Sequence, residues 1–135
     1  MFGEQDYLMR QINDFSRALG KTLFNKSVPS EEIVNPDGSI SEEAMNKAIL
    51  LKKIEDGKLN EAENFLFDVL NKSDDPAMLE VGVWFYAQLN KQSDKQLEQA
   101  EFSREEIADG LNEIKAMLAK YDSFYETISK ENAEK

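Results

Sequence analysis

Only carboxylates, lysines and tyrosines could perform acid–base chemistry here, because the 135 residues include no histidine and no cysteine. These two absences exclude Ser-His and Cys-His catalysis, imidazole or thiolate metal sites, and disulfide bonds within the chain. The carboxylate pairs Glu61/Glu63 and Glu105/Glu106 do not face each other at helical spacing. We therefore expect no catalytic residues, no cofactor-binding residues and no metal ligands.

The aromatic cluster Trp84-Phe85-Tyr86 could line a ligand pocket, since such pockets are rich in aromatic side chains. We expect it to pack in the core instead, because it lies in a segment that is apolar nearly all round, from Met78 to Leu89. Tyr86 is the exception, because a buried hydroxyl needs a hydrogen-bond partner or an opening to solvent.

The charge balance restricts the classes of partner. Sixteen basic and 27 acidic residues give a net charge of −11. This charge opposes binding to nucleic acid and to anionic membranes, and it favours basic or neutral protein partners. The chain has no run of apolar residues long enough to span a membrane, and Glu4 and Asp6 precede its first apolar segment, unlike a signal peptide. We expect a cytoplasmic protein.

The positions of the apolar residues predict helices, and no alternating run predicts a strand. Residues 1–26 form an amphipathic helix, whose apolar stripe recurs at steps of three and four residues. The stripe consists of Leu8, Ile12, Phe15, Leu19 and Leu23. Residues 27–40 contain the turn Asn35-Pro36-Asp37-Gly38 and form a linker.

A second helix begins at the N-cap Ser41, with Ile40 and Met45 placed as a hydrophobic staple, and ends at Asp56-Gly57. A third helix follows at once, so the two are antiparallel neighbours. The second helix carries a broad apolar arc, which we expect other helices to cover. The arc contains Ala44, Met45, Ala48, Ile49, Leu51 and Ile54.

Asp75-Pro76 opens a fourth, central helix, because a carboxylate caps it and proline tolerates its first turn. A short helical stretch from Lys95 to Gln99 follows it. The capping box Ser103/Glu106 opens the last helix. Its apolar residues keep a 3.5-residue period, which is typical of a helix that packs along its whole length. They are Ile107, Leu111, Ile114, Leu118, Tyr121, Tyr125 and Ile128.

We therefore predict an all-α fold of stacked antiparallel helical hairpins, with a hairpin domain over residues 41–121 and a helical extension with a frayed tail over 122–135. The second and third helices resemble a tetratricopeptide repeat in its second half, although Leu50 and Lys53 depart from its first half. That resemblance would place Lys47 and Leu51 toward a binding groove. The matching residues are Gly57, Leu59, Ala62, Leu66 and Pro76.

Four stretches together resemble an uncharacterised family of small helical proteins from Gram-positive bacteria. The resemblance covers about residues 4–121 and implies a cytoplasmic helical domain with tetratricopeptide-like packing, without an assigned activity. The stretches are Asp6 to Ile12, Gly57 to Leu66, Phe85 to Asp94, and Phe102 to Leu111.

These patterns favour a non-catalytic protein–protein interaction module, an adaptor or regulator that self-associates through its last or first helix. Two alternatives stay open: a peripheral membrane protein that binds through its N-terminal helix, and an enzyme that uses a carboxylate or lysine site not visible in the sequence. We expect Phe124 to lie in the same partner interface as the apolar residues near the end of the last helix. The candidate partner-binding residues are Lys47, Leu51, Tyr121, Phe124, Tyr125 and Ile128.

Overall fold

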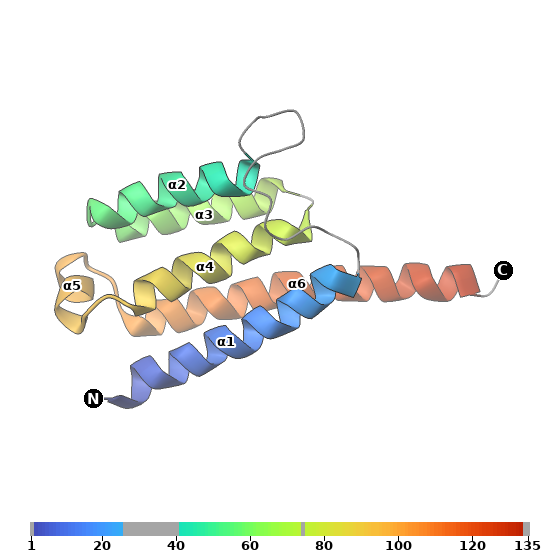
Figure 1. Cartoon of the computed structure of the whole chain (residues 1–135), viewed down its shortest axis with the longest axis horizontal. Helices are drawn as coiled ribbons and strands as arrows, with labels where there is room; N and C mark the ends of the chain where they lie inside the picture. The colour runs from blue at the N-terminus through green and yellow to red at the C-terminus, as the bar shows by residue number, and fades with distance from the viewer. Residues whose placement is uncertain (1, 26–40, 74, 134–135) are drawn as a thin grey trace.

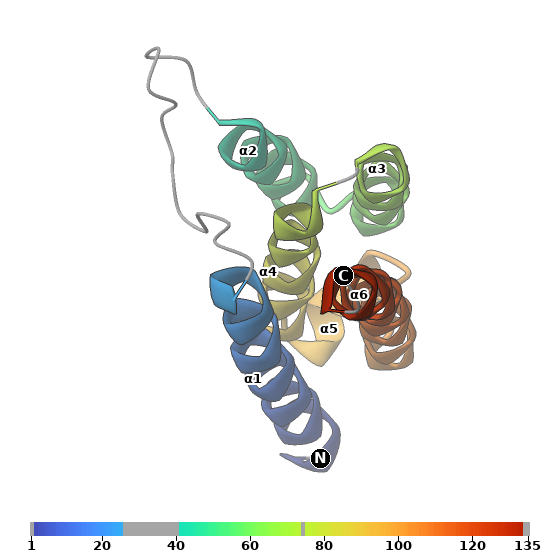
Figure 2. The same ribbon diagram turned by 90° about the vertical axis from the view of Figure 1, so that its right-hand side faces the viewer.

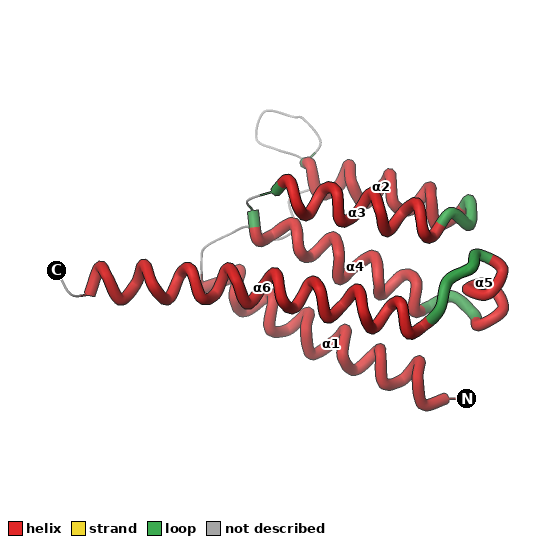
Figure 3. Tube along the Cα trace, turned by 180° about the vertical axis from the view of Figure 1, so that it is seen from behind, coloured by secondary structure: helices red, strands yellow, loops and turns green. Residues whose placement is uncertain are grey.

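The computed structural model describes the backbone of residues 2–25, 41–73 and 75–133, and the side chains of 3–20, 41–73 and 75–120. Within these ranges every regular element is a helix, so the predicted all-α class is confirmed (Figure 3). The helices are α1 (Phe2–Asn25), α2 (Glu42–Glu55), α3 (Leu59–Lys72), α4 (Leu79–Asn90), α5 (Asp94–Gln99) and α6 (Arg104–Ala133), with a 3-10 turn, η1 (Pro76–Met78), before α4.

Helix α4 lies at the centre of the molecule. It contacts α1 and α6 on one side and the α2–α3 hairpin on the other (Figures 1 and 2). Its apolar residues leave almost no polar face, so burial on several sides is the arrangement that removes most of them from water. Gly82 allows α6 to approach closely, since a Cβ there would lie 2.5 Å from Cδ1 of Ile114. The predicted central element is confirmed.

The helix ends follow the predicted capping residues. The Ser41 hydroxyl accepts a hydrogen bond from the Ala44 amide, and Gly57 adopts a φ of 74°, which favours glycine. The capping box of Ser103 and Glu106 is present in both directions, at 3.2 and 2.9 Å. The Asp75 carboxylate caps a 3-10 turn that precedes α4, which is the one departure from the expected α-helical start.

Helix α1 packs on its own chain. Its apolar stripe is buried against α4 and α6, and Gln11 accepts a hydrogen bond of 2.7 Å from Lys115 of α6. The predicted linker, residues 27–40, and Ile40 of the predicted staple lie outside the described residues. The buried stripe consists of Leu8, Ile12, Phe15 and Leu19.

The apolar arc of α2 is covered only in part, which corrects the expectation that other helices would bury it. The strip on one side of the helix, Asn46, Leu50 and Ile54, is buried against α3, η1 and α4. Because α2 lies at the edge of the bundle, the opposite side has no helix over it among the described elements (Figure 2). Met45, Ala48, Ile49 and Leu51 are exposed there.

Helix α6 has two parts. Its first half buries the predicted stripe of Ile107, Leu111, Ile114 and Leu118. Its second half continues as helix to Ala133 and extends beyond the other helices (Figure 1). The side chains of Tyr121, Phe124, Tyr125 and Ile128, which sequence analysis placed in a partner interface, lie outside the described residues.

Candidate functional site

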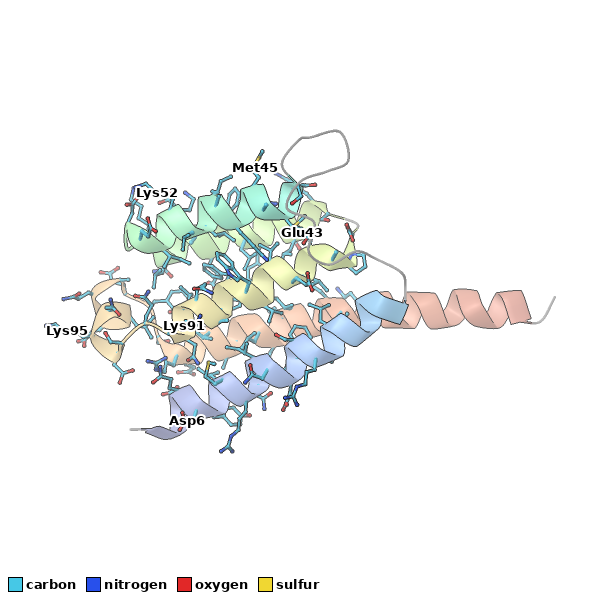
Figure 4. The ribbon with its side chains drawn as sticks, in the orientation of Figure 1. Asp6, Glu43, Met45, Lys52, Lys91 and Lys95 are labelled. Carbon is cyan, nitrogen blue, oxygen red and sulfur yellow. The ribbon has the colours of Figure 1, made fainter. Side chains whose placement is uncertain are left out.

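The outer side of α2 carries an exposed apolar surface, which we call the α2 face and define as Met45, Ala48, Ile49 and Leu51. The exposed fractions of Met45, Ile49 and Leu51 are 52%, 37% and 41%, and Tyr7 is the one further large hydrophobic exposed among the described side chains. Met45 points away from the bundle (Figure 4). Single exposed hydrophobics are ordinary, but Met45 and Ile49 lie one helical turn apart on the same side of α2, and Leu51 lies on the other flank of the exposed arc.

Helix α2 holds this face in a fixed position. Leu50 and Ile54 anchor it in the core, and the Asn46 side chain donates to Sδ of Met78 at 3.6 Å. The ammonium of Lys53 lies 3.4 Å from the Glu61 carboxylate of α3. The backbone of α2 is therefore preformed and would lose little conformational entropy on binding.

A groove opens where α2 passes α1 and α4. It has a volume of about 260 Å³. The ammonium nitrogen of Lys47 lies 5.8 Å from the centroid of the Trp84 ring, which is within range of a cation–π attraction. We call it the Trp84 groove and define it by its lining residues, which are Ser16, Leu19, Lys47, Glu80, Val83, Trp84 and Ala87.

Carboxylates dominate the electrostatics beside this groove. The pKa of Glu43 is raised to about 7, first by burial and then by the negative charges of Glu80 and Asp75, while Lys47 opposes the shift. The part of this shift that Glu80 and Asp75 cause shows that a further negative charge is unfavourable at this position. The same field would attract a positive charge.

A second hollow, of about 360 Å³, lies between the α2–α3 turn and α5. Its walls are the ends of short helices and three glutamine side chains, Gln92, Gln96 and Gln99. Its acidic residues, Glu55 and Asp56, lie on the exposed end of α2.

Tyr86 has the hydrogen-bond partner that a buried hydroxyl requires. Its side chain has no exposed surface, and its hydroxyl donates to the Glu63 carboxylate at 2.6 Å. Burial raises the pKa of both groups, although the hydrogen bond from Tyr86 lowers that of Glu63. This is the one pair of hydrogen-bonded groups with shifted pKa values among the described residues. Tyr86 lies on α4 and Glu63 on α3, so this hydrogen bond joins the two helices.

Arg104, the first residue of α6, was not among the predicted site residues. It joins the ends of α4, α5 and α6 directly and reaches α1 through Asn90. Its guanidinium donates to the carbonyl and side-chain oxygens of Asn90 at 3.2 and 2.9 Å, to the Gln92 carbonyl at 2.9 Å, and to the Asp94 carboxylate at 2.9 Å. Asn90 and Gln5 of α1 exchange two hydrogen bonds at 2.9 and 3.2 Å. An arginine in the first turn of a helix is unfavourable for the helix dipole. This unusual position is the feature of the sequence that could have indicated a structural role for Arg104.

The structure brings two of the predicted partner-binding residues together. Lys47 lies in the Trp84 groove and Leu51 on the α2 face, one helical turn apart. Within the described part of the chain, no group of acidic residues is arranged to hold a metal ion, and no helix is long and apolar enough to cross a membrane.

Comparison with known proteins gives a family match. The model of a family of unknown function, DUF6483, matches residues 2–119. No curated protein and no solved structure matches the chain significantly. The match includes the four stretches on which the sequence resemblance rests and stops before the extended part of α6.

Proposed function

Since the chain belongs to DUF6483, a family of unknown function, we propose its role from its surface alone: it is a non-catalytic module that binds other proteins through the α2 face. The observation that carries this proposal is the exposure of Met45, Ile49 and Leu51 on one edge helix of an otherwise well-covered bundle. We further propose that the α2–α3 hairpin presents this face as a tetratricopeptide-like unit would, and that the module works in the cytoplasm.

The chemistry of the α2 face fits a protein partner. Complete burial of a methionine, isoleucine or leucine side chain contributes about 1.5–3 kcal/mol, so covering the rest of these three supplies a core for an interface. Lys52 and Glu55 border the face and are exposed, which matches the polar rim of a protein interface. The membrane alternative has less support, because the apolar stripe of α1 is buried against α4 and α6.

The first prediction concerns Met45→Lys combined with Ile49→Lys. Both side chains are exposed, so we expect the free energy of unfolding to change by no more than about 0.5 kcal/mol for each substitution. We expect the pair to abolish partner binding, because two lysines would have to be desolvated in the interface. Affinity purification from the native host with quantitative mass spectrometry measures the binding, and denaturant unfolding measures stability.

A matched control keeps the added charge and moves it away from α2. Asn64→Lys with Asn112→Lys adds the same two lysines at exposed positions of α3 and α6. A protein that the wild type and this control retain and the α2 variant loses supports the proposal. If every captured protein remains with the α2 variant, the α2 face is not the binding surface.

The second prediction concerns self-association. We propose that the extended part of α6 binds a second copy of the chain, because it carries apolar residues at helical spacing beyond the packed body (Figure 1). Removing residues 122–135 is expected to convert a dimer into a monomer on light scattering, with unchanged helicity per residue. A full-length chain that stays monomeric at high concentration contradicts this expectation.

A further inference from the structure

We propose that the Trp84 groove binds a lysine or arginine side chain of the partner, stacked on the Trp84 ring in the place that Lys47 occupies. The inference rests on the proposed function and names the chemistry of the partner: a segment that combines a basic residue with apolar ones. Three observations carry it, namely the way Lys47 is held, the charge around the groove and the position of the groove beside the α2 face.

Lys47 is held in a way that permits exchange. Its ammonium faces the ring of Trp84 at 5.8 Å and forms no ion pair with a described carboxylate, in contrast to Lys53 on the same helix, which pairs with Glu61. The Glu43 carboxylate also attracts Lys47 electrostatically, but without an ion pair between them the ammonium is held only weakly where water can reach it. The open groove gives solvent, or another cation, access to the same ring.

The surrounding charge favours a basic occupant over an acidic one. Glu80 lines the groove, and Glu43, Glu42 and Asp75 lie close enough to interact electrostatically at that end of α2, whereas Lys47 is the cation there among the described side chains. The chain as a whole carries a net charge of −11, which attracts a basic partner from a distance. A guanidinium suits the ring best, because it is planar and stacks on aromatic faces.

The groove continues into the α2 face. Lys47 and Leu51 are one turn apart on α2, so a segment that covers Leu51 has its next turn beside the ring of Trp84. The floor of the groove is apolar, with Leu19, Val83 and Ala87. It would therefore accept the methylene chain of a lysine or arginine while the charged end lies over the ring.

The test uses Trp84, the one tryptophan of the chain, as its own reporter. The probe is a synthetic helix of about four turns built from leucine and lysine, and the matched probe has glutamate in place of each lysine. We expect the lysine helix to change the Trp84 fluorescence of the full-length protein and the glutamate helix to leave it unchanged.

The decisive comparison is Lys47→Ala against Lys72→Ala, which changes an exposed lysine of α3 outside the α2 face. Each variant removes one positive charge from the protein, so the net charge that attracts the probe changes equally. Only Lys47→Ala vacates the ring, and we expect it to bind the lysine helix about fivefold more tightly than Lys72→Ala does. Trp84→Phe is expected to weaken binding of the lysine helix, because phenylalanine attracts cations less strongly than tryptophan. Fluorescence anisotropy of a labelled probe measures this binding, since the variant has no tryptophan to report it.

Each outcome decides between the two proposals. Equal affinities of Lys47→Ala and Lys72→Ala, or a fluorescence response to the glutamate helix, or no response to either helix, overturn the groove assignment. The proposal for the α2 face is tested separately by the Met45→Lys and Ile49→Lys experiment, which measures binding of the native partner. Circular dichroism of each variant verifies that the fold is retained.

Discussion

Replacing Arg104 with methionine is expected to lower the free energy of unfolding by about 2–4 kcal/mol, because each buried oxygen that loses its donor costs about 1–3 kcal/mol. Methionine keeps much of the side-chain volume and loses every donor. Arg104 is 8% exposed, and its guanidinium donates hydrogen bonds to oxygens of Asn90 and Gln92. In the variant these oxygens would lose this donor in a region that water hardly reaches. A domain of ordinary stability, about 5–15 kcal/mol, would lose a large part of it.

The network explains why the effect should extend to α1. Asn90 accepts from Arg104 and exchanges two hydrogen bonds with Gln5, so the arginine fixes the residue on which the start of α1 rests. In Arg104→Met we expect hydrogen exchange to speed up most in α1 and at the junction of α4 and α5. Uniform acceleration over all helices would contradict this local role.

Two variants calibrate the measurement, which is denaturant unfolding of the full chain. Arg104→Lys keeps the charge but not the planar fork, so it should recover only part of the stability. Asp94→Asn removes the carboxylate from an ion pair whose acidic side chain is 79% exposed, so it should lower stability by no more than about 1 kcal/mol. An Arg104→Met variant as stable as Asp94→Asn would show that the network contributes little.

The sequence predicts the helix ends and the core because these depend on local chemistry. Ser41, Gly57 and Ser103 act within one helical turn, so their residue types alone indicate where a helix begins or ends. The apolar surround of α4 predicts its central position without knowledge of its neighbours. These features are confirmed wherever the described residues include them.

What the sequence could not predict depends on which helices become neighbours. The apolar arc of α2 is compatible with burial on either side, and only the position of α2 at the edge of the bundle leaves Met45 and Ile49 exposed. Arg104 forms hydrogen bonds with Asn90, Gln92 and Asp94, which precede it by 10 to 14 residues. No rule based on residue spacing predicts these contacts. The candidate site therefore depends on which helices pack against each other, and no sequence motif defines it.

The substitution Gly110→Ala is expected to lower the free energy of unfolding by about 2 kcal/mol or more, although alanine is favoured over glycine in a helix by about 1 kcal/mol. A Cβ at Gly110 would overlap the hydroxyl end of Tyr86 and lie 2.7 Å from its Cε1. Tyr86 cannot retreat, because it is fully buried and its hydroxyl is held by Glu63 at 2.6 Å. The overlap involves a rigid ring, so steric repulsion outweighs helix propensity.

The same substitution elsewhere in the chain should have the opposite sign. Gly20 lies on an exposed side of α1, and no atom lies within 4 Å of the position that a Cβ would take there, so Gly20→Ala should raise stability by up to about 1 kcal/mol. Tyr86→Leu shortens the side chain that faces Gly110, and in that background Gly110→Ala should lose most of its effect. Chemical denaturation of the single and double variants measures this coupling. If Gly110→Ala is neutral in the wild type, or equally harmful with Leu at position 86, the contact between α4 and α6 at Tyr86 is looser than the packing around it implies.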